Sequence, residues 1–427
     1  MKRALRWAVG GSMMLLALSA TVTAAPVDDQ VHLGVASCAS GPCHGKLTPS
    51  DTSNVWLNEY RIWSADDRHA RAYQTLLSPE SQRMARKLGL PNAQSAKICL
   101  DCHSDNVPPE QRGPRFQISD GVGCEACHGG AGKWIESHTE PGATHADNLA
   151  RGMLATERIE VRAEVCLSCH LGTRDQFATH RIMGAGHPRL SFELEAYTAN
   201  QPAHYEVDDD YRQRKGAPTG FEVWRAGQVQ SQLRFLTLME SPLFAAALPD
   251  FAFFDCHSCH HPMEDIRWSE TRRQHGLEPG GLRLQDQHLI MLRALVEVVA
   301  PADRQPLQEA HVRLLQAGQQ SVPAARAAAT ALKDWLQDRP WASSPVSREQ
   351  VKSVRRAIAR AGARGELADF AAAEQAFLGI ESLSIYLGDA ERLQGALDAI
   401  FSVVESDRSF DPQKLRAAMQ RLSGELE

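Results

Sequence analysis

The stretch that decides the fold is residues 121–130, which read GVGCEACHGG. Within it, Cys124, Cys127 and His128 form a Cys-x-x-Cys-His unit, a spacing typical of covalent c-type haem attachment. Two thiols at this spacing can add to the two vinyl groups on one edge of a porphyrin. The histidine that follows is then placed to bind the iron from one side through a neutral ring nitrogen.

This unit recurs along the chain. All ten cysteines fall in five local pairs, and a histidine follows the second member of each pair. The thiols that we expect to attach haem are Cys38, Cys43, Cys99, Cys102, Cys124, Cys127, Cys166, Cys169, Cys256 and Cys259. The histidines that we expect to bind the irons, here called the motif histidines of sites one to five, are His44, His103, His128, His170 and His260. The sequence therefore predicts five covalently attached haem c groups.

Three other uses of paired cysteines fit this pattern less well. A framework of long-range disulfides would not place every cysteine so close to its partner in sequence. Zinc sites use Cys-x-x-Cys pairs but do not require a histidine directly after each second cysteine. Thioredoxin-like redox chemistry would use one such pair. The first motif, CASGPCH, has a wider gap, and its Gly41 and Pro42 permit a different turn that can still span a porphyrin edge.

A second imidazole on each iron would give low-spin sites suited to electron transfer. Histidines outside the motifs are concentrated between residues 69 and 261. The candidate second ligands are His69, His138, His145, His180 and His187. His204 is a further candidate that we place below these five. His257 and His261 are interpreted as neighbours of the fifth haem, because the motif spacing directs the histidine between them to the iron.

Residues 1–24 have the pattern of a signal peptide, with a basic start, an apolar run and small residues before Ala25. The alternative, a retained membrane anchor, is less favoured because glycines and a serine interrupt the short apolar run. We expect export to the periplasm as a soluble protein with no membrane span. The formal net charge of −6 argues against nucleic acid and anionic membranes as partners. Redox proteins or a quinone-linked complex are the expected partners.

The chain divides by composition, because no cysteine follows Cys259. We predict a mainly α protein, with a loop-rich multihaem cytochrome domain over residues 25–280 and an α-helical bundle over residues 281–427. In the bundle, Leu289, Leu292 and Leu295 follow helical spacing, and Ser347 with Gln350 resembles a capping box. Its role is open between docking or dimerisation and a lid on the haems. Helices predicted in the first half cover residues 55–77, 79–88, 151–157 and 222–240.

Several stretches together resemble the multihaem c-type cytochromes of the cytochrome c554 type, which are related in haem arrangement to hydroxylamine oxidoreductase and the multihaem nitrite reductases. They are SCASGPCHG, HARAY, GAGHPRLSFEL and FDCHSCHHPM, and the resemblance spans about residues 35–265. It implies closely packed haem pairs and second ligands supplied from remote positions. By that pattern, His69 resembles the second ligand of the third haem and His138 that of the first. His180 and His187 would serve the fourth and fifth in either order.

The sequence departs from this family in ways that bear on function. The simplest members have four haems, and the second haem is five-coordinate in the type member, so His145 would decide whether the site of His103 is open. No motif ends in lysine, as the catalytic motif of the nitrite reductases does. We expect a periplasmic electron carrier with mostly bis-histidine haems. The alternatives are a haem oxidoreductase acting on a nitrogen-oxide or sulfur molecule at an open axial position, and a structural subunit docked through the bundle.

Overall fold

The computed structural model describes residues 30–51, 55–246, 248–261, 277–278 and 280–427. The predicted signal peptide, residues 1–24, lies outside them. The described chain is mainly α-helical and has two isolated β-bridges, His32 with Arg112 and Phe254 with Leu284. None of the helices in these ranges combines the length and the apolar character that crossing a membrane requires.

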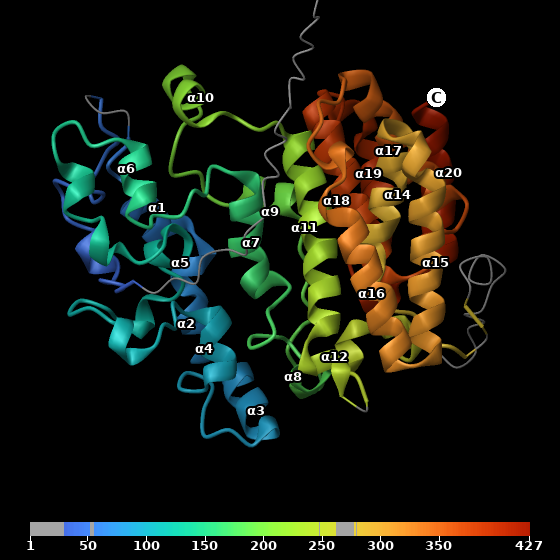
Figure 1. Ribbon diagram of the computed structural model, residues 1–427, viewed down its shortest axis with the longest axis horizontal. Coiled ribbons are helices and arrows are strands. Elements are labelled where there is room, and N and C mark those ends of the chain that lie inside the picture. The colour runs from blue at the N-terminus through green and yellow to red at the C-terminus, as the bar shows by residue number, and fades with distance from the viewer. Residues whose placement is uncertain (1–29, 52–54, 247, 262–276, 279) are drawn as a thin grey trace, which may run out of the picture.

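The first half is built from short helices joined by loops and 3-10 turns (Figure 1). These helices are α1 (Glu59–Asp66), α2 (Ala72–Leu76), α3 (Pro79–Leu88), α4 (Lys97–His103), α5 (Cys124–His128), α6 (His145–Ala150), α7 (Ile159–His170), α8 (His180–Ala185), α9 (Leu194–Asn200) and α10 (Asp209–Lys215). Its hydrophobic clusters are small, and one contains only Leu76, Ala85, Ala93 and Leu100 as buried members. Side chains alone therefore give this half little conventional core.

Three of the five motifs form the end of a helix. Helices α4, α5 and α7 end at the motif histidines His103, His128 and His170. In a helix, residues three apart lie on the same face, so the two cysteines of each of these motifs project to the same side. The fifth motif begins in a 3-10 turn, Cys256–Ser258.

Local sequence signals account for most helix ends in this half. The prediction for residues 79–88 is confirmed by α3, where the Ser78 side chain accepts from the Ser81 N–H and Gly89 ends the helix in the left-handed region. Residues 55–77 do not form one helix, because Asp67 leaves helical geometry and caps a 3-10 turn. The helix predicted at residues 151–157 is wrong. Helix α6 ends at Ala150, and α7 begins only at Ile159.

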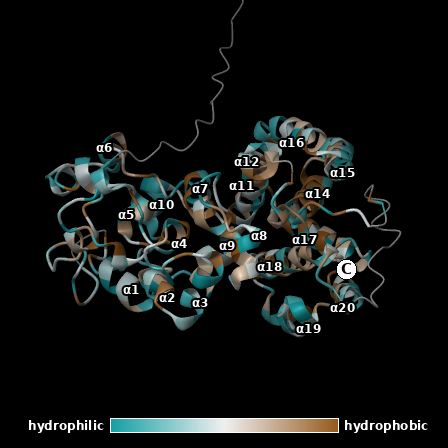
Figure 2. Ribbon diagram, turned by 90° about the horizontal axis from the view of Figure 1, so that it is seen from below, coloured by the Kyte–Doolittle hydropathy of each residue, from teal (hydrophilic) through white to brown (hydrophobic). Residues whose placement is uncertain are grey.

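The second half is a bundle of long helices around one large core (Figure 1). Its elements are α11 (Gly220–Glu240), α12 (Pro242–Ala245), α14 (Gln287–Val299), α15 (Arg304–Gln320), α16 (Val322–Gln337), α17 (Arg348–Ala363), α18 (Phe370–Leu387), α19 (Gln394–Val404) and α20 (Pro412–Glu425). The capping box predicted at Ser347 and Gln350 is confirmed at the start of α17. Figure 2 shows hydrophilic colour on α15 and more hydrophobic colour at α14 inside the group.

Helix α11 forms the wall between the two halves. It packs against α7 and α9 on one side and against α14, α16 and α18 on the other. This explains why 14 of its residues are buried although its sequence lacks a clear apolar stripe. The large core accordingly runs from Phe221 to Leu426 and includes residues before position 281. The division of the chain into domains at residue 280 stays a prediction.

The fifth motif is attached to the bundle. The Asp255 N–H donates to the Arg283 carbonyl at 2.8 Å, next to the bridge between Phe254 and Leu284. Inside the motif, the His257 ring donates to the Asp407 carbonyl at 3.0 Å and lies beside Phe370 and Phe410. His257 is thus part of the packing that fixes the motif on the bundle.

A buried charged cluster supports this junction. Arg283 donates to Asp286 at 3.1 and 2.7 Å, and the His311 ring donates to the same carboxylate at 2.7 Å. All three side chains are about 1% exposed. Burial opposes the ionisation of Asp286, but the Arg283 charge and the His311 hydrogen bond outweigh it and hold the pKa far below its usual range.

Glu193 joins the two halves through α9. Its carboxylate caps α9 by accepting from the Glu195 and Ala196 N–H groups at 3.1 and 2.7 Å, and it lies 3.5 Å from the Ser382 hydroxyl of α18. Gln375 of α18 also donates to the neighbouring Phe192 carbonyl at 2.8 Å. Burial raises the pKa of Glu193 to about 7. The start of α9 is therefore fixed on the bundle.

Candidate functional site

Each of the five motif histidines faces a second histidine from a distant segment. The separations of the ring centroids fall in one narrow range, 6.2 to 6.4 Å. The pairs, in motif order, are His44 with His138, His103 with His187, His128 with His204, His170 with His69, and His260 with His180.

This spacing fits two imidazoles on opposite sides of one metal ion. A bond from an imidazole nitrogen to a transition metal is about 2.0–2.1 Å, and the ring centre lies roughly 1.1 Å behind that nitrogen, so two opposed rings have centres about 6.2–6.4 Å apart. Rings in direct van der Waals stacking lie closer, as His170 and Phe192 do at 4.7 Å. The residues present therefore fit a haem iron held between two imidazoles at five places.

Five of these ten imidazoles hold a hydrogen bond through their Nδ1 atom. The Nδ1 atoms of His103, His138 and His187 donate to the carbonyls of Ala72, Ile135 and Pro188 at 3.0, 2.5 and 2.8 Å. His204 bonds to the Pro202 carbonyl. Those of His44 and His69 donate to the carboxylates of Glu59 and Asp67, both at 2.9 Å. A ligating histidine usually donates its other ring N–H in this way, which leaves Nε2 for the metal.

Burial also keeps two of the motif imidazoles in the form that binds metal. It lowers the pKa of His128 and of His170 to about 4. Both rings are therefore neutral at pH 7, and only a neutral imidazole has a lone pair for the iron.

Cysteines of different motifs contact one another, and these contacts show which sites are neighbours. The thiols of Cys38 and Cys124 hydrogen-bond to each other, as do those of Cys102 and Cys169. The amide of Gln176 donates to both Cys102 and Cys169, at 3.3 and 3.0 Å. Motif one thus lies against motif three, and motif two against motif four.

A further contact connects these two couples of motifs. Burial, together with the nearby thiols of Cys166 and Cys169, raises the pKa of Cys127 to about 12. Helix α5 of motif three also packs against α7 of motif four, so these two motifs lie side by side. Helix α8 extends the arrangement to the fifth site, since His180 at its start faces His260 and His187 just past its end faces His103.

Residues 121–130, the stretch GVGCEACHGG, connect the segments at the centre of this arrangement. Gly121 has φ of 76°, and an added Cβ would lie 2.6 Å from the His69 carbonyl oxygen, so only glycine fits. The Val122 N–H then donates to that same carbonyl at 3.1 Å. Trp63 of α1 donates to the Val122 carbonyl at 3.0 Å. The third motif and the segment of His69 are thus in backbone contact.

Glu125, between the two cysteines of the third motif, fixes the first described residues. Its carboxylate is buried and accepts from the N–H groups of Leu33, Gly34 and Ala131 at 2.8, 2.7 and 2.7 Å. The carboxylate therefore joins the segment that precedes motif one to motif three.

The wider first motif folds into a compact turn. The His44 N–H donates to the Cys38 carbonyl at 3.1 Å, and the Cys43 N–H donates to Ser40 at 3.0 Å. The two extra residues are absorbed in this turn, which leaves the Cys38 thiol in contact with Cys124. The wider gap is thus compatible with the role expected for this motif.

The structure corrects part of the predicted pairing. His138 faces His44, the partner that the resemblance implied. His69 faces His170 of the fourth motif and not His128 of the third. The segment of His69 does touch the third motif through its backbone, but its ring points to the fourth. His187 and His180, expected at the fourth and fifth sites, face the second and fifth motif histidines.

His145 is not one of the histidines that face a motif histidine in the described chain. Its Nε2 atom hydrogen-bonds to the Glu157 carboxylate at 2.8 Å, so the nitrogen that a ligand would offer is already engaged. His204, a lower-ranked candidate than these five on sequence alone, occupies the position opposite His128. It lies in a polar stretch, residues 200–219, whose sequence carries no local signal for a ligand. The hydrogen bond from Gln201 to Asp67 at 3.1 Å instead fixes this segment against the haem half.

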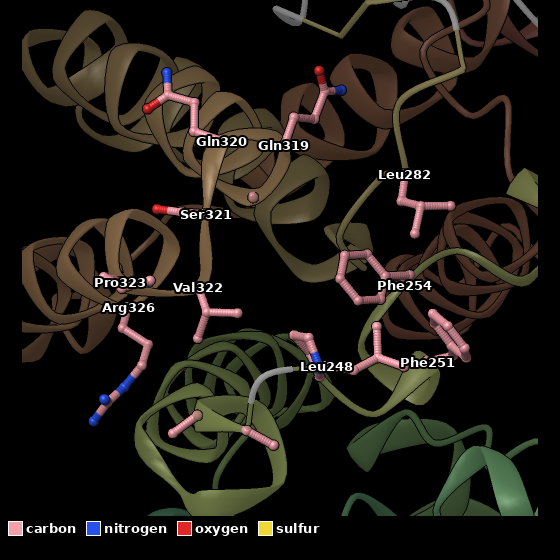
Figure 3. A pocket seen from close by; sticks show the side chains of 14 residues that line it. Leu248, Phe251, Phe254, Leu282, Gln319, Gln320, Ser321, Val322, Pro323 and Arg326 are labelled. Atoms are coloured by element: carbon pink, nitrogen blue, oxygen red, sulfur yellow. The ribbon is translucent and has the colours of Figure 1, made fainter.

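The fifth site lies beside a pocket of about 580 Å³ (Figure 3). The Phe251 ring contacts the His180 ring edge-on, with centroids 5.5 Å apart, and also lines the pocket. Figure 3 shows Phe251, Phe254 and Leu282 facing the segment from Gln319 to Arg326 across it. Cys259 of this site is exposed, whereas the other nine cysteines are half-buried.

Comparison with known proteins bears on the first three sites. Residues 37–129 match the family model described as cytochrome c554 and c-prime. This span contains the first three motifs and His69 and ends just after His128. No curated protein and no solved structure matches the chain.

Proposed function

We propose that the chain carries electrons through five haems, each held between two histidines. The premise is the match over residues 37–129, which supports a cytochrome c554-type multihaem cytochrome. Membership of this family implies covalently bound haem c and a part in electron transfer. The number of haems, their ligands and the location are our proposal.

The observation that carries the proposal is the set of five histidine pairs at one common spacing. Haem c between two imidazoles supplies a one-electron Fe(III)/Fe(II) couple with both axial positions filled. The cysteines would tether each porphyrin, and the paired histidines would clamp it from both sides. The carbonyls and carboxylates on Nδ1 would orient the rings and reduce movement during electron exchange.

The contacts between motifs support one order for the sites. Site one touches site three through Cys38 and Cys124. Site three lies beside site four, because α5 packs against α7. Site four touches site two through Cys169 and Cys102. Helix α8 connects sites two and five. We therefore propose electron transfer along the order one, three, four, two, five, with the exposed fifth site exchanging electrons with a redox partner.

The alternative function, reduction or oxidation of a small nitrogen-oxide or sulfur molecule, has less support. It requires an iron with one open axial side. The second site, which the resemblance suggested as open, has His187 opposite His103 at 6.4 Å between ring centres. The other four motif histidines are faced in the same way. The arrangement favours a carrier over a catalyst.

Location and partners follow from the sequence and the same geometry. We propose a periplasmic protein, because the predicted signal peptide would direct export. Covalent haem attachment would follow on the far side of the membrane. The partner would be a redox protein or a quinone-linked complex that approaches the fifth site. The bundle, to which this motif is attached, would support that contact, and self-association through the bundle stays a prediction.

The experiment is a haem count on the purified protein. Pyridine haemochrome absorbance against protein mass should give five haems per chain, and coulometric reduction should take up five electrons. A Cys38→Ser, Cys43→Ser variant should give four of each, which assigns the first motif. A count of four in the unaltered protein would refute the five-site proposal. Turnover of nitrite or hydroxylamine at a rate sufficient for an enzyme would favour the alternative.

A further inference from the structure

The imidazoles of the proposed sites differ in what accepts their Nδ1 proton. At His103, His138 and His187 the acceptor is a backbone carbonyl. Two histidines have a carboxylate instead. Glu59 accepts from His44 of site one, and Asp67 accepts from His69 of site four, each at 2.9 Å.

The Glu59 carboxylate is held in place from two sides. One oxygen accepts from His44, and the other accepts from the Leu57 N–H at 3.0 Å. Leu57 has φ of 59°, a left-handed conformation that is costly for a branched residue. The Leu57 carbonyl in turn accepts from the Lys46 N–H at 2.8 Å, two residues past His44. The chain therefore maintains a strained turn at the position that fixes this carboxylate.

The Asp67 carboxylate is held more tightly and is buried, with 7% of its side chain exposed. One oxygen accepts from both the backbone N–H and the ring Nδ1 of His69, each at 2.9 Å. The other accepts from Gln201 at 3.1 Å. No rotation of the carboxylate is possible without losing one of these bonds.

An ionised acceptor changes the imidazole more than a carbonyl does. A carboxylate draws the Nδ1 proton toward itself and makes Nε2 a stronger donor to the metal. It also adds a negative charge near the site, which favours Fe(III) over Fe(II) by Coulomb attraction. Both effects lower the reduction potential of that site. The effect should be larger at Asp67, because water screens a buried charge less.

The two carboxylates are distributed one to each neighbouring couple of sites. Site one, with Glu59, touches site three, and site four, with Asp67, touches site two. We propose that Glu59 and Asp67 are positioning residues that lower the potentials of the first and fourth haems, so that each couple contains one low-potential and one higher-potential site. This inference rests on the proposed five-haem carrier. Within each couple, electrons would flow from the low-potential site to its neighbour, from site one to site three and from site four to site two.

The test is a potentiometric titration of the haem-loaded protein with Glu59→Gln or Asp67→Asn. Each variant should raise one of the five midpoints, so that at a fixed potential near that midpoint the ratio of reduced to oxidised haem increases about tenfold, which is about 59 mV for a one-electron couple. The Asp67 variant should give the larger change. The control is Glu80→Gln, which removes an exposed carboxylate bonded to Arg83 on α3 and should leave all five midpoints in place.

Haem count and spin state separate this inference from the function on which it rests. Five low-spin haems with unmoved midpoints in both variants would overturn the tuning role and leave the carrier intact. Fewer haems in the unaltered protein would refute the carrier itself. If neither variant loads haem, the five midpoints of the unaltered protein test the inference. Two midpoints clearly below the other three support the inference, and five midpoints in one group overturn it.

Discussion

His204 and His145 offer the sharpest mutational contrast, because the sequence favours one as a ligand and the structure places the other opposite His128. In the His204→Ala variant, the iron at His128 would lose its second ligand while the other four pairs stay intact. In His145→Ala, only the hydrogen bond to Glu157 is lost. The two changes remove the same side chain from the same half of the protein.

The expected fraction of high-spin haem follows from the number of histidine pairs. Because one of five pairs is broken, His204→Ala should convert one fifth of the haem iron to a high-spin form. After reduction, carbon monoxide should bind with a stoichiometry of one per chain. His145→Ala should bind none and should keep the spectrum of the unaltered protein. Added free imidazole should restore the low-spin spectrum of the His204 variant.

The assay is absorption spectroscopy with carbon monoxide titration of the reduced proteins, with haem content measured on the same samples. If His145→Ala creates the carbon monoxide site and His204→Ala does not, the pairing described above is refuted. If both variants bind carbon monoxide, the facing histidines do not identify the ligands.

Three further predictions concern stability. Glu125→Gln replaces a carboxylate that accepts from three backbone N–H groups, and at least one of these bonds is lost. The free energy of unfolding, measured by denaturant titration, should fall by about 1–3 kcal/mol. Asp286→Asn removes the closest carboxylate partner of the buried Arg283 and leaves it Asp369 at 3.9 Å, so the free energy of unfolding should fall by about 3–5 kcal/mol. The folded pKa of Glu193, about 7, lies above its value of 4.5 in the unfolded chain, so its contribution to stability is complete below pH 4.5 and is lost as the pH rises through 7. Glu193→Gln should remove that decline, which amounts to at most about 3 kcal/mol between pH 4.5 and 8.

Much of the fold was predictable from the sequence because local rules decide it. The mainly α class, helix α3 and the capped start of α17 follow from capping residues and apolar spacing. The break at Asp67 was not predictable, because a hydrogen bond to a ring two residues later competes with continuation of the helix. The burial of α11 on both sides also depends on tertiary contacts that its sequence does not signal.

The motif cysteines and histidines were predictable because covalent attachment fixes their spacing in the chain. The second ligands are not fixed in this way, since they come from segments distant in sequence. The family resemblance assigned His69 to the third site, but only its backbone contacts the third motif, and its ring faces His170. His204 lies in a polar stretch whose anchoring depends on Gln201 meeting Asp67 in space. Sequence density alone could not separate it from His145.

The measurement that tests the central claim most directly is quantitative electron paramagnetic resonance of the fully oxidised, unaltered protein, normalised to haem and to chain. Five facing pairs predict five low-spin Fe(III) centres per chain, no high-spin signal, and no carbon monoxide binding after reduction. A high-spin signal equal to one fifth of the iron, or a total of four centres, would contradict it.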